Sequence, residues 1–238
     1  MTTKRTLSDL FTAGAHRYDL LVGANPGYHR HLDTAAGRLA RDARPQRVLD
    51  LGCGTGASTA AILRAAPWAS VRGVDASAGM VERARAKQWP PGQVEFAQGM
   101  AGDAEVMAGE EGERPYDACL AAYLLRNVPP HDRTAVLRSV GEQLREGGAL
   151  AIQDYSVAGS RRAALVWHLV CWLVVIPLSA LTLGDTRLYR YLWRSVREME
   201  DVGSWRARLR EAGFEPVAVH PGSGWQRDLL HTVIAVRR

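Results

Sequence analysis

Short runs of apolar residues alternate with segments of helical periodicity from position 48 to the end of the chain. Seven apolar runs predict strands, at 48–51, 71–75, 94–97, 116–122, 149–153, 214–219 and 231–236. Between them, segments with a helical pattern and start or stop signals predict helices at 57–66, 78–87, 133–144 and 205–212. We expect Asp132 to cap the start of the helix at 133–144 and Glu146-Gly147-Gly148 to stop it. This alternation predicts an α/β fold with a doubly wound sheet. We expect residues 102–115, which are rich in Gly and Glu, to form an exposed loop.

Two regions stand outside this alternation. Residues 1–45 precede the first strand and predict two helices, at 11–21 and 28–43. Residues 163–183 contain 21 residues without a charge, which is long enough to cross a membrane. Because the run lies between two strands of one sheet, we favour an internal cap over an apolar substrate. An interfacial or dimer-forming helix and a transmembrane helix remain alternatives.

The length of 238 residues suits one domain, with 47% hydrophobic and 23% charged residues. We divide it into four parts: a helical leader at 1–45, a nucleoside-binding core at 46–156, an apolar cap insert at 157–195, and a C-terminal helix with strands at 196–238. No internal repeat or low-complexity tract interrupts this order.

The charge and the cysteine content limit the binding partners, metals and cellular locations that we expect. The net charge of +5 is spread along the chain without a basic patch interleaved with aromatic residues, so we expect no nucleic-acid partner. An anionic membrane surface would fit the charge equally well. The three cysteines have neither disulfide nor metal-site spacing, so we expect no metal and a reducing compartment. The polar N-terminus lacks signal-peptide features, so the expected location is the cytoplasm, with peripheral contact at the inner membrane face as a further option.

The candidate chemistry centres on the glycine-rich stretch from Arg47 to Gly56. A short apolar strand is followed by glycines at alternate positions and then by a helix, which is the arrangement of a nucleotide-type ligand site. Asp75 ends the next predicted strand, where a carboxylate can accept both hydroxyls of a ribose. A bare structural turn is the alternative.

Val48 to Gly56 together with Asp75 resembles motif I and the acidic loop of class I S-adenosylmethionine (SAM) methyltransferases. The resemblance implies a Rossmann-like sheet of seven strands with the last antiparallel, and SAM as cofactor. The residues that would bind the cofactor are Asp50, Gly52, Cys53, Gly54, Thr55, Gly56, Asp75, Ala76, Met80, Met100, Ala101 and Tyr123. Met100 stands where the family has an acidic or amide residue that pairs with adenine, so Asp103 or a backbone group would have to replace it.

A narrower resemblance rests on four segments spread over nearly the whole chain. They are Leu125-Arg126-Asn127-Val128, Asp154-Tyr155-Ser156, Tyr189-Arg190-Tyr191-Leu192, and Tyr18-Asp19 followed by Gly27-Tyr28-His29-Arg30. They are similar to the ubiquinone/menaquinone-biosynthesis C-methyltransferases, which implies methyl transfer to a carbon of a lipophilic quinol such as demethylmenaquinol. The implied catalytic residues are Arg126, Asp154, His29 and Tyr18, and Asn127 and Tyr189 are implied substrate contacts. From the uncharged run at 163–183 we expect Trp167 and Trp172 to contact the substrate as well.

Other functions remain open at this stage. Leu124 replaces the family's glycine, which leaves room for a methyltransferase acting at carbon, oxygen or nitrogen of a small aromatic or terpenoid metabolite. A SAM-binding, membrane-associated protein without methyl transfer is the alternative from another class. A homo-oligomer is compatible with the sequence. Arg126 is always protonated and therefore a poor base, so Asp154 or His29 is the better candidate for proton removal.

Overall fold

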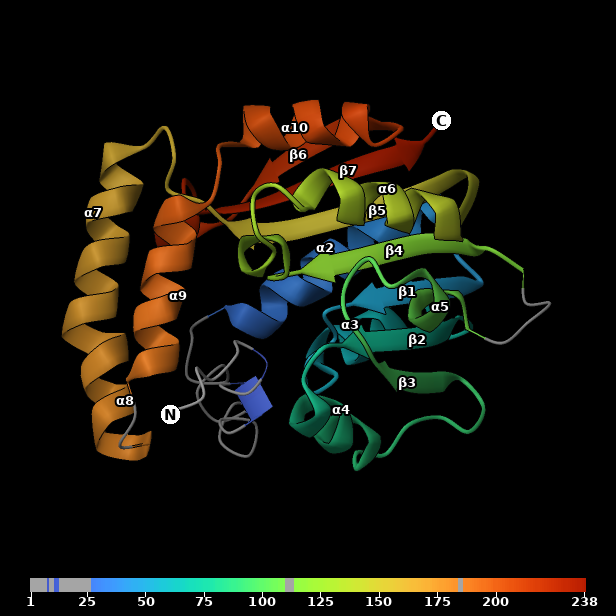
Figure 1. Cartoon of the computed structure of the whole chain (residues 1–238), viewed down its shortest axis with the longest axis horizontal. Helices are drawn as coiled ribbons and strands as arrows, with labels where there is room; N and C mark the ends of the chain where they lie inside the picture. The colour runs from blue at the N-terminus through green and yellow to red at the C-terminus, as the bar shows by residue number, and fades with distance from the viewer. Residues whose placement is uncertain (1–7, 9–10, 13–26, 110–113, 184–185) are drawn as a thin grey trace, which may run out of the picture.

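The computed structural model describes residues 8, 11–12, 27–109, 114–183 and 186–238. A seven-stranded sheet in the order β3-β2-β1-β4-β5-β7-β6 forms its centre (Figure 1). The strands are β1 (Arg47–Leu51), β2 (Ser70–Asp75), β3 (Val94–Gln98), β4 (Tyr116–Ala122), β5 (Leu144–Tyr155), β6 (Phe214–Pro221) and β7 (Leu230–Arg237). The first five strands are parallel, and β7 is antiparallel to both β5 and β6. The predicted doubly wound fold is confirmed.

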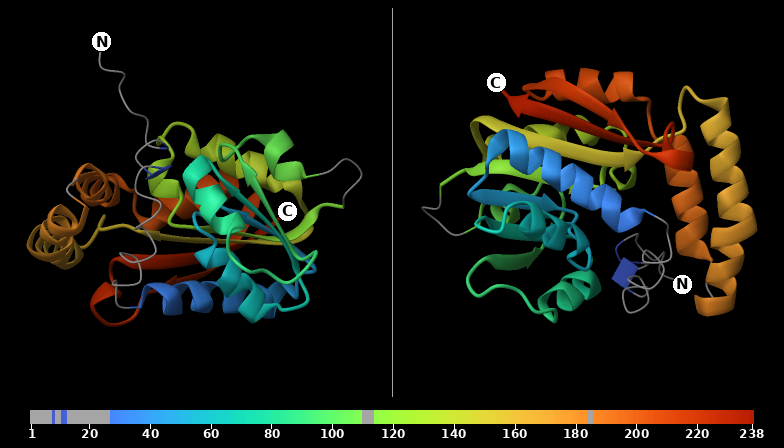
Figure 2. Two further views of the ribbon diagram at one scale, coloured as in Figure 1. Left: turned by 90° about the horizontal axis from the view of Figure 1, so that it is seen from below. Right: turned by 180° about the vertical axis from the view of Figure 1, so that it is seen from behind.

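Helices cover both faces of this sheet (Figures 1 and 2). They include α2 (Tyr28–Ala43), α3 (Ala57–Ala65), α4 (Ala78–Arg85), α5 (Ala104–Ala108), α6 (Arg133–Gln143) and α10 (Val202–Glu211). Successive residues of a strand pack alternately in two separate apolar clusters, because their side chains point to opposite faces of the sheet. Val48 packs in the cluster that includes α2, whereas Leu49 packs in the cluster that includes α6 and α10. The sheet is therefore buried on both faces, as expected for parallel strands.

The strand order reverses between β1 and β4, which is where ligands bind in open α/β sheets. The glycine turn that follows β1 and the loop that follows β4 meet at this point. A 3₁₀ turn, Leu125–Asn127, forms the start of the second loop.

A helical hairpin stands at one end of the sheet (Figure 1). Its outer arm is α7 (Arg161–Val170), a π turn (Cys171–Val175) and α8 (Ile176–Leu183), and its inner arm is α9 (Arg187–Glu198). The outer arm buries a stripe made up of Ala163, Trp167, Cys171, Ile176 and Ser179. The spacing of four residues along this stripe becomes five between Cys171 and Ile176, because the π turn adds one residue to the helix.

Three local predictions are wrong. Residues 102–115 do not form only a loop, because the side chain of Asp103 caps α5 by accepting from the N–H of Val106 and Met107 is fully buried. The helix that starts at Arg133 ends before residues 146–148, which belong to β5 and not to a helix stop. Asp132 occupies the N-cap position of α6, but its side chain makes no capping hydrogen bond.

Candidate active site

A cavity of about 660 Å³ opens at the carboxyl ends of β1, β2 and β4. Most of the predicted cofactor residues line it: Gly52, Cys53, Gly54, Thr55, Asp75, Ala76, Met80, Met100, Ala101 and Tyr123. Arg126 and Asn127 line it from the loop after β4. The fold thus brings the two sequence motifs, which are separated by about 70 residues, to opposite sides of one space.

The glycine turn presents its backbone to this cavity at one position in particular. Gly52, Gly54 and Gly56 all have positive φ angles, of 76°, 54° and 87°. A Cβ atom on Gly56 would lie 2.7 Å from the ring of Trp89, whereas a Cβ atom on Gly54 would meet nothing within 4 Å. Because Gly54 also lines the cavity, a side chain there would occupy space that the turn leaves open. This is the cradle that a nucleoside ligand requires.

Asp75 is tied to the glycine turn by hydrogen bonds. The backbone N–H of Gly54 donates to Oδ2 over 2.9 Å, and the N–H of Ser77 donates to Oδ1 over 2.8 Å. Burial raises the pKa of Asp75, while the two N–H donors oppose the shift. Each carboxylate oxygen has further acceptor capacity, so the side chain can accept ribose hydroxyls at the cavity wall. These residues fit the nucleoside part of SAM.

Asp50 lies behind the turn and does not line the cavity. Its side chain is fully buried, and Oδ2 accepts hydrogen bonds from Ser58 Oγ at 2.8 Å and Thr59 Oγ1 at 2.6 Å. Burial raises the pKa of Asp50 to about 6. These contacts fasten the first turn of α3 to the end of β1, and the predicted direct contact of Asp50 with the cofactor stays a prediction.

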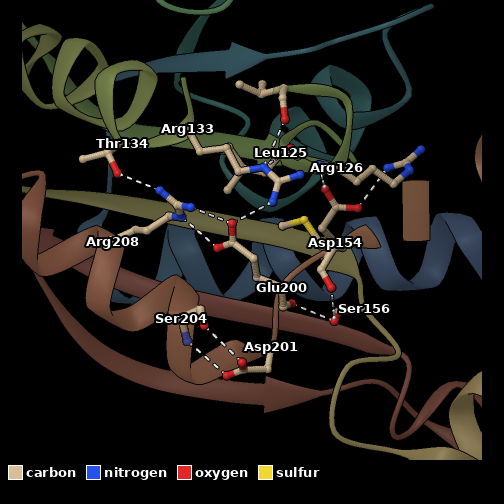
Figure 3. A network of polar contacts seen from close by, with 12 residues as sticks. Leu125, Arg126, Arg133, Thr134, Asp154, Ser156, Glu200, Asp201, Ser204 and Arg208 are labelled. Atoms are coloured by element: carbon tan, nitrogen blue, oxygen red, sulfur yellow. Dashed lines mark hydrogen bonds and ion pairs between the residues drawn. The ribbon is translucent and has the colours of Figure 1, made fainter. Parts of the chain in front are cut away.

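Arg126 and Asp154 form a buried ion pair beside the cavity (Figure 3). Arg126 Nη1 donates to Asp154 Oδ1 over 2.9 Å, and the backbone N–H of Arg126 donates to Oδ2 over 3.0 Å. Oδ1 also accepts from the N–H of Tyr155. Asp154 is fully buried and does not line the cavity, so it is placed to hold Arg126 and not to touch a bound acceptor.

Four further predicted site residues do not line the cavity. His29 is exposed on α2, and Trp167, Trp172 and Tyr189 belong to the helical hairpin without lining the cavity. Tyr18 lies outside the described residues. The predicted cap over the substrate stays a prediction for this part of the insert, whose outer side faces the exterior. No group of three metal-binding side chains occurs within the described ranges.

Comparisons with known proteins agree with this geometry. The sequence model of the ubiE/COQ5 methyltransferase family matches residues 2–224. A ubiquinone/menaquinone biosynthesis C-methyltransferase from Bradyrhizobium diazoefficiens is 32% identical, over 94% of this chain and 92% of its own length. Its counterpart from Methylobacterium nodulans is 30% identical, over 92% of this chain and 90% of its own length. The chain belongs to the ubiE/COQ5 methyltransferase family.

The fold agrees with that of a solved methyltransferase. Magnesium protoporphyrin IX methyltransferase from Synechocystis, with bound S-adenosylhomocysteine, superposes with a TM-score of 0.68 at 18% identity, and 98% of each chain is covered. As a member of the ubiE/COQ5 family, the chain is a SAM-dependent methyltransferase with SAM as cofactor.

Behind the Arg126 loop, this family member contains a polar network that the sequence did not predict (Figure 3). Arg133 Nε donates to the carbonyl oxygens of Leu125 and Val128, at 3.1 and 3.0 Å. Glu200 accepts from Arg133 Nη1 at 3.1 Å and from two nitrogens of Arg208 at 2.7 Å each. The hydrogen bond from Arg208 is the main reason that the pKa of Glu200 is lowered. The network fixes the loop that carries Arg126.

One signal in the sequence could have revealed Arg133. It is the first residue of α6, where a positive charge opposes the helix dipole. An arginine at such a position needs another reason to be there, and the two loop carbonyls supply it. Its acidic partner Glu200 is 67 residues away, so no local pattern could identify the pair.

Tyr123 is held in a strained backbone conformation at the end of β4. Its φ angle is +58°, which is uncommon for a residue with a side chain. Its N–H donates to the carbonyl oxygen of Gln153 over 2.6 Å, and its own carbonyl accepts from Asn127 Nδ2 over 3.1 Å and from Arg126. The ring lies between those of Tyr28 and Tyr155, at centroid distances of 5.2 and 5.0 Å. These contacts fix an aromatic wall of the cavity.

Position 100, where the family has an acidic or amide residue that pairs with adenine, is a methionine in this chain. Met100 lines the cavity and is 66% exposed. Asp103 also lines it, and one of its oxygens, Oδ1, accepts from the N–H of Val106 at 3.3 Å. Asp103 and the backbone at 99–102 line the cavity beside Met100, and the replacement of the family's acidic or amide residue by one of them stays a prediction.

Proposed function

We propose that this methyltransferase transfers the methyl group of SAM to a ring carbon of a lipophilic phenol or quinol, of the demethylmenaquinol type. The observation that carries the proposal is the position of Arg126, which faces the cavity from the loop after β4 while Asp154 holds it from behind. The family membership and the relatives named as C-methyltransferases of quinone biosynthesis support the same reaction.

The cofactor would lie along the glycine turn. Asp75 would accept the ribose hydroxyls, Gly54 would allow the close approach, and Met80 would pack beside the base. Asp103 or the backbone at 99–102 would read the adenine edge. Bound SAM supplies an electrophilic methyl group on a positively charged sulfur.

Arg126 would bind the oxygen of the acceptor ring. A phenol becomes nucleophilic at carbon when its hydroxyl loses a proton, and a fixed guanidinium favours that charged form. Because Arg126 stays protonated, it would orient and stabilise the phenolate without acting as the base. The hydroxyl proton would leave to water at the cavity mouth before the transfer. The methyl group would exchange its bond to sulfur for a bond to the ring carbon, and that carbon would then lose its own proton to water, which restores the aromatic ring.

A dry pocket favours this reaction because opposite charges are neutralised as the methyl group moves. Tyr28 and Tyr123 line the cavity and contribute apolar surface near the proposed ring site, and Tyr155 packs on Tyr123 without lining the cavity. The acceptor is accordingly lipophilic, with the ring oriented by Arg126 and Asn127. We also propose a cytoplasmic location, consistent with a pool of intracellular SAM.

A second candidate is a compact aromatic metabolite. Leu124 lines the cavity and packs on the glycine turn, since a Cβ atom on Gly52 would lie 3.0 Å from Leu124 Cδ1. A leucine at this point leaves less room beside the turn than the glycine of the quinone-biosynthesis pattern. This favours a smaller acceptor, methylated at carbon, oxygen or nitrogen.

The test is product analysis with purified protein, SAM and a panel of quinols that share one ring but differ in tail length, together with small phenols. We expect a product heavier by one methyl group on carbon and a KM that falls as the tail lengthens. Arg126→Lys should lower kcat/KM by about tenfold or more, ~1.4 kcal/mol, without a matching loss of SAM affinity.

The matched control is Arg64→Lys, which changes an exposed arginine paired with Asp33. Normal turnover by Arg126→Lys would contradict the assigned role. Methylation of small phenols only, with no preference for a tail, would replace the quinol by the compact acceptor.

A further inference from the structure

The outer side of the α7–α8 arm is an exposed apolar surface. Eleven large apolar side chains of the described chain are exposed, and six of them lie on this arm: Leu165, Leu169, Trp172, Leu173, Val174 and Leu178, between 40% and 70% exposed. The arm forms the outermost layer at its end of the molecule (Figures 1 and 2). A concentration of this kind marks an interaction surface.

The hairpin that carries this apolar surface also carries many positive charges. The described part of the hairpin, 161–183 and 186–198, carries six exposed arginines: Arg161, Arg162, Arg187, Arg190, Arg194 and Arg197. Glu198 is the single acidic residue in those ranges. The guanidinium of Arg190 lies 5.9 Å from the ring centre of Trp172, so cationic and apolar groups are adjacent. We propose that this hairpin docks the enzyme onto an anionic lipid surface, with α7–α8 lying in the plane of the interface.

The packing explains why the arm would lie on a bilayer and not cross it. Residues 161–180 form one helix that is long and apolar enough to span, with a mean hydropathy of 2.1 in its most apolar window. Its inner stripe, however, belongs to the main core: the ring of Trp167 lies 5.6 Å from that of Tyr155, and Trp167 Nε1 donates to the carbonyl oxygen of Trp193. A spanning helix would have to give up these contacts, whereas an interfacial helix keeps them.

Charge complementarity favours lipid over a second copy of the chain. A two-fold partner would bring its own arginine-rich hairpin against this one, because an isologous interface pairs identical surfaces. An anionic bilayer supplies the opposite charge and an apolar layer at the same time, and each arginine near such a surface contributes about 1 kcal/mol. The inference does not depend on the identity of the methyl acceptor, because it concerns binding to lipid alone.

The test is vesicle flotation of the full chain without substrate. Vesicles of phosphatidylcholine alone are compared with an equimolar mixture of phosphatidylcholine and phosphatidylglycerol. We expect stronger partition onto the anionic vesicles, weakened by salt. Arg161→Ser with Arg162→Ser should reduce that partition by about fivefold per residue and leave binding to neutral vesicles nearly unchanged.

The apolar contribution is tested by Leu173→Glu, with Val217→Glu as the matched control. Leu173 is 70% exposed on the hairpin and Val217 is 59% exposed on β6, so both substitutions add the same charge at solvent-facing positions. We expect Leu173→Glu to reduce partition by about tenfold or more, since it removes a leucine from the apolar layer, and Val217→Glu to have no effect. Leu165→Gln, at a site 59% exposed, repeats the test if Leu173→Glu fails to fold.

Several outcomes would overturn the proposal. One is the absence of partition onto anionic vesicles by the wild type. Another is an equal loss in Leu173→Glu and Val217→Glu. A third is a wild-type dimer in sedimentation that Leu173→Glu dissociates, without any vesicle binding, which would assign the surface to a second copy. Turnover of a water-soluble phenol is measured in parallel, so loss of docking is distinguished from loss of catalysis.

Discussion

The ion pair between Arg126 and Asp154 predicts a strong energetic coupling between two positions 28 residues apart. The perturbation is a double-mutant cycle with Arg126→Met and Asp154→Asn. Each substitution is close to the native side chain in size, and the pair removes both charges together. The cycle measures the free energy of unfolding and the turnover rate of the same four proteins.

The expected loss in the free energy of unfolding follows from the burial of the Arg126–Asp154 pair. Arg126→Met leaves the carboxylate of Asp154, which is fully buried, without its cationic partner, although the N–H groups of Arg126 and Tyr155 still donate to it. Removing one member of a buried pair costs about 3–5 kcal/mol. Asp154→Asn should cost less, about 1–3 kcal/mol, because the guanidinium at the cavity wall can be hydrated and keeps its bond to the carbonyl of Tyr123. In the double variant no charge is left unpaired, so the coupling energy should be at least ~1.5 kcal/mol.

Urea unfolding at pH 7, followed by circular dichroism, gives the four free energies, and the m values must agree for the cycle to be valid. Calorimetry gives the SAM affinity, and product formation gives kcat/KM. We expect both variants that lack Arg126 to lose turnover, while the double variant regains much of the stability lost by Arg126→Met. Free energies that add within about 0.5 kcal/mol would refute the reasoning, since they would show that the two side chains act independently.

Three further predictions concern the cofactor side of the cavity. Gly54→Val should abolish SAM binding in calorimetry, because the valine side chain would enter the cavity. Gly37→Val, which also has open space at the Cβ position, is the control and should bind SAM normally. Retained SAM binding by a folded Gly54→Val variant would count against the site. Asp75→Ala should weaken SAM by about 1–3 kcal/mol through lost hydrogen bonds to a charged group, and an unchanged affinity would remove it from the site. Burial raises the pKa of Asp50 from 3.8 to about 6, so the folded state binds the proton more tightly and stability should fall by up to ~3 kcal/mol as pH rises through this window. Asp50→Asn should lack that slope in urea titrations at pH 4 to 7, and an identical slope in both proteins would contradict the shift.

The strands could be predicted because each carries its own pattern. β1, for example, joins apolar residues to a glycine turn within ten residues, so the whole unit is visible in the local sequence. The extent of β5 was not visible in this way. Gly147 and Gly148 suggested the end of a helix, but strand pairing with β4 already begins at Leu144, which lies opposite Tyr116. A contact between residues so far apart leaves no local signature.

The site residues likewise fall into those that a local sequence pattern predicts and those that depend on distant contacts. The glycine turn and Asp75 were predictable from one βαβ unit, whereas the pinning of the Arg126 loop by Arg133, Glu200 and Arg208 depends on a helix near the end of the chain. The uncharged run at 163–183 showed an apolar segment but not its orientation. The packing of Trp167 against Tyr155 and Trp193 decides which side faces inward, and these partners lie on β5 and α9.

The π turn at Cys171–Val175 has a consequence for chain length. It contains one more residue than an α-helical path between Cys171 and Ile176 would need, and Val174 within it is 56% exposed. A chain without Val174 would restore the four-residue spacing and keep Trp167, Cys171 and Ile176 on one side of a continuous α-helix. Related sequences can therefore differ by a single-residue gap at this point without changing which side chains reach the core. An alignment that forces the gap elsewhere would assign the wrong residues to the exposed side of the arm.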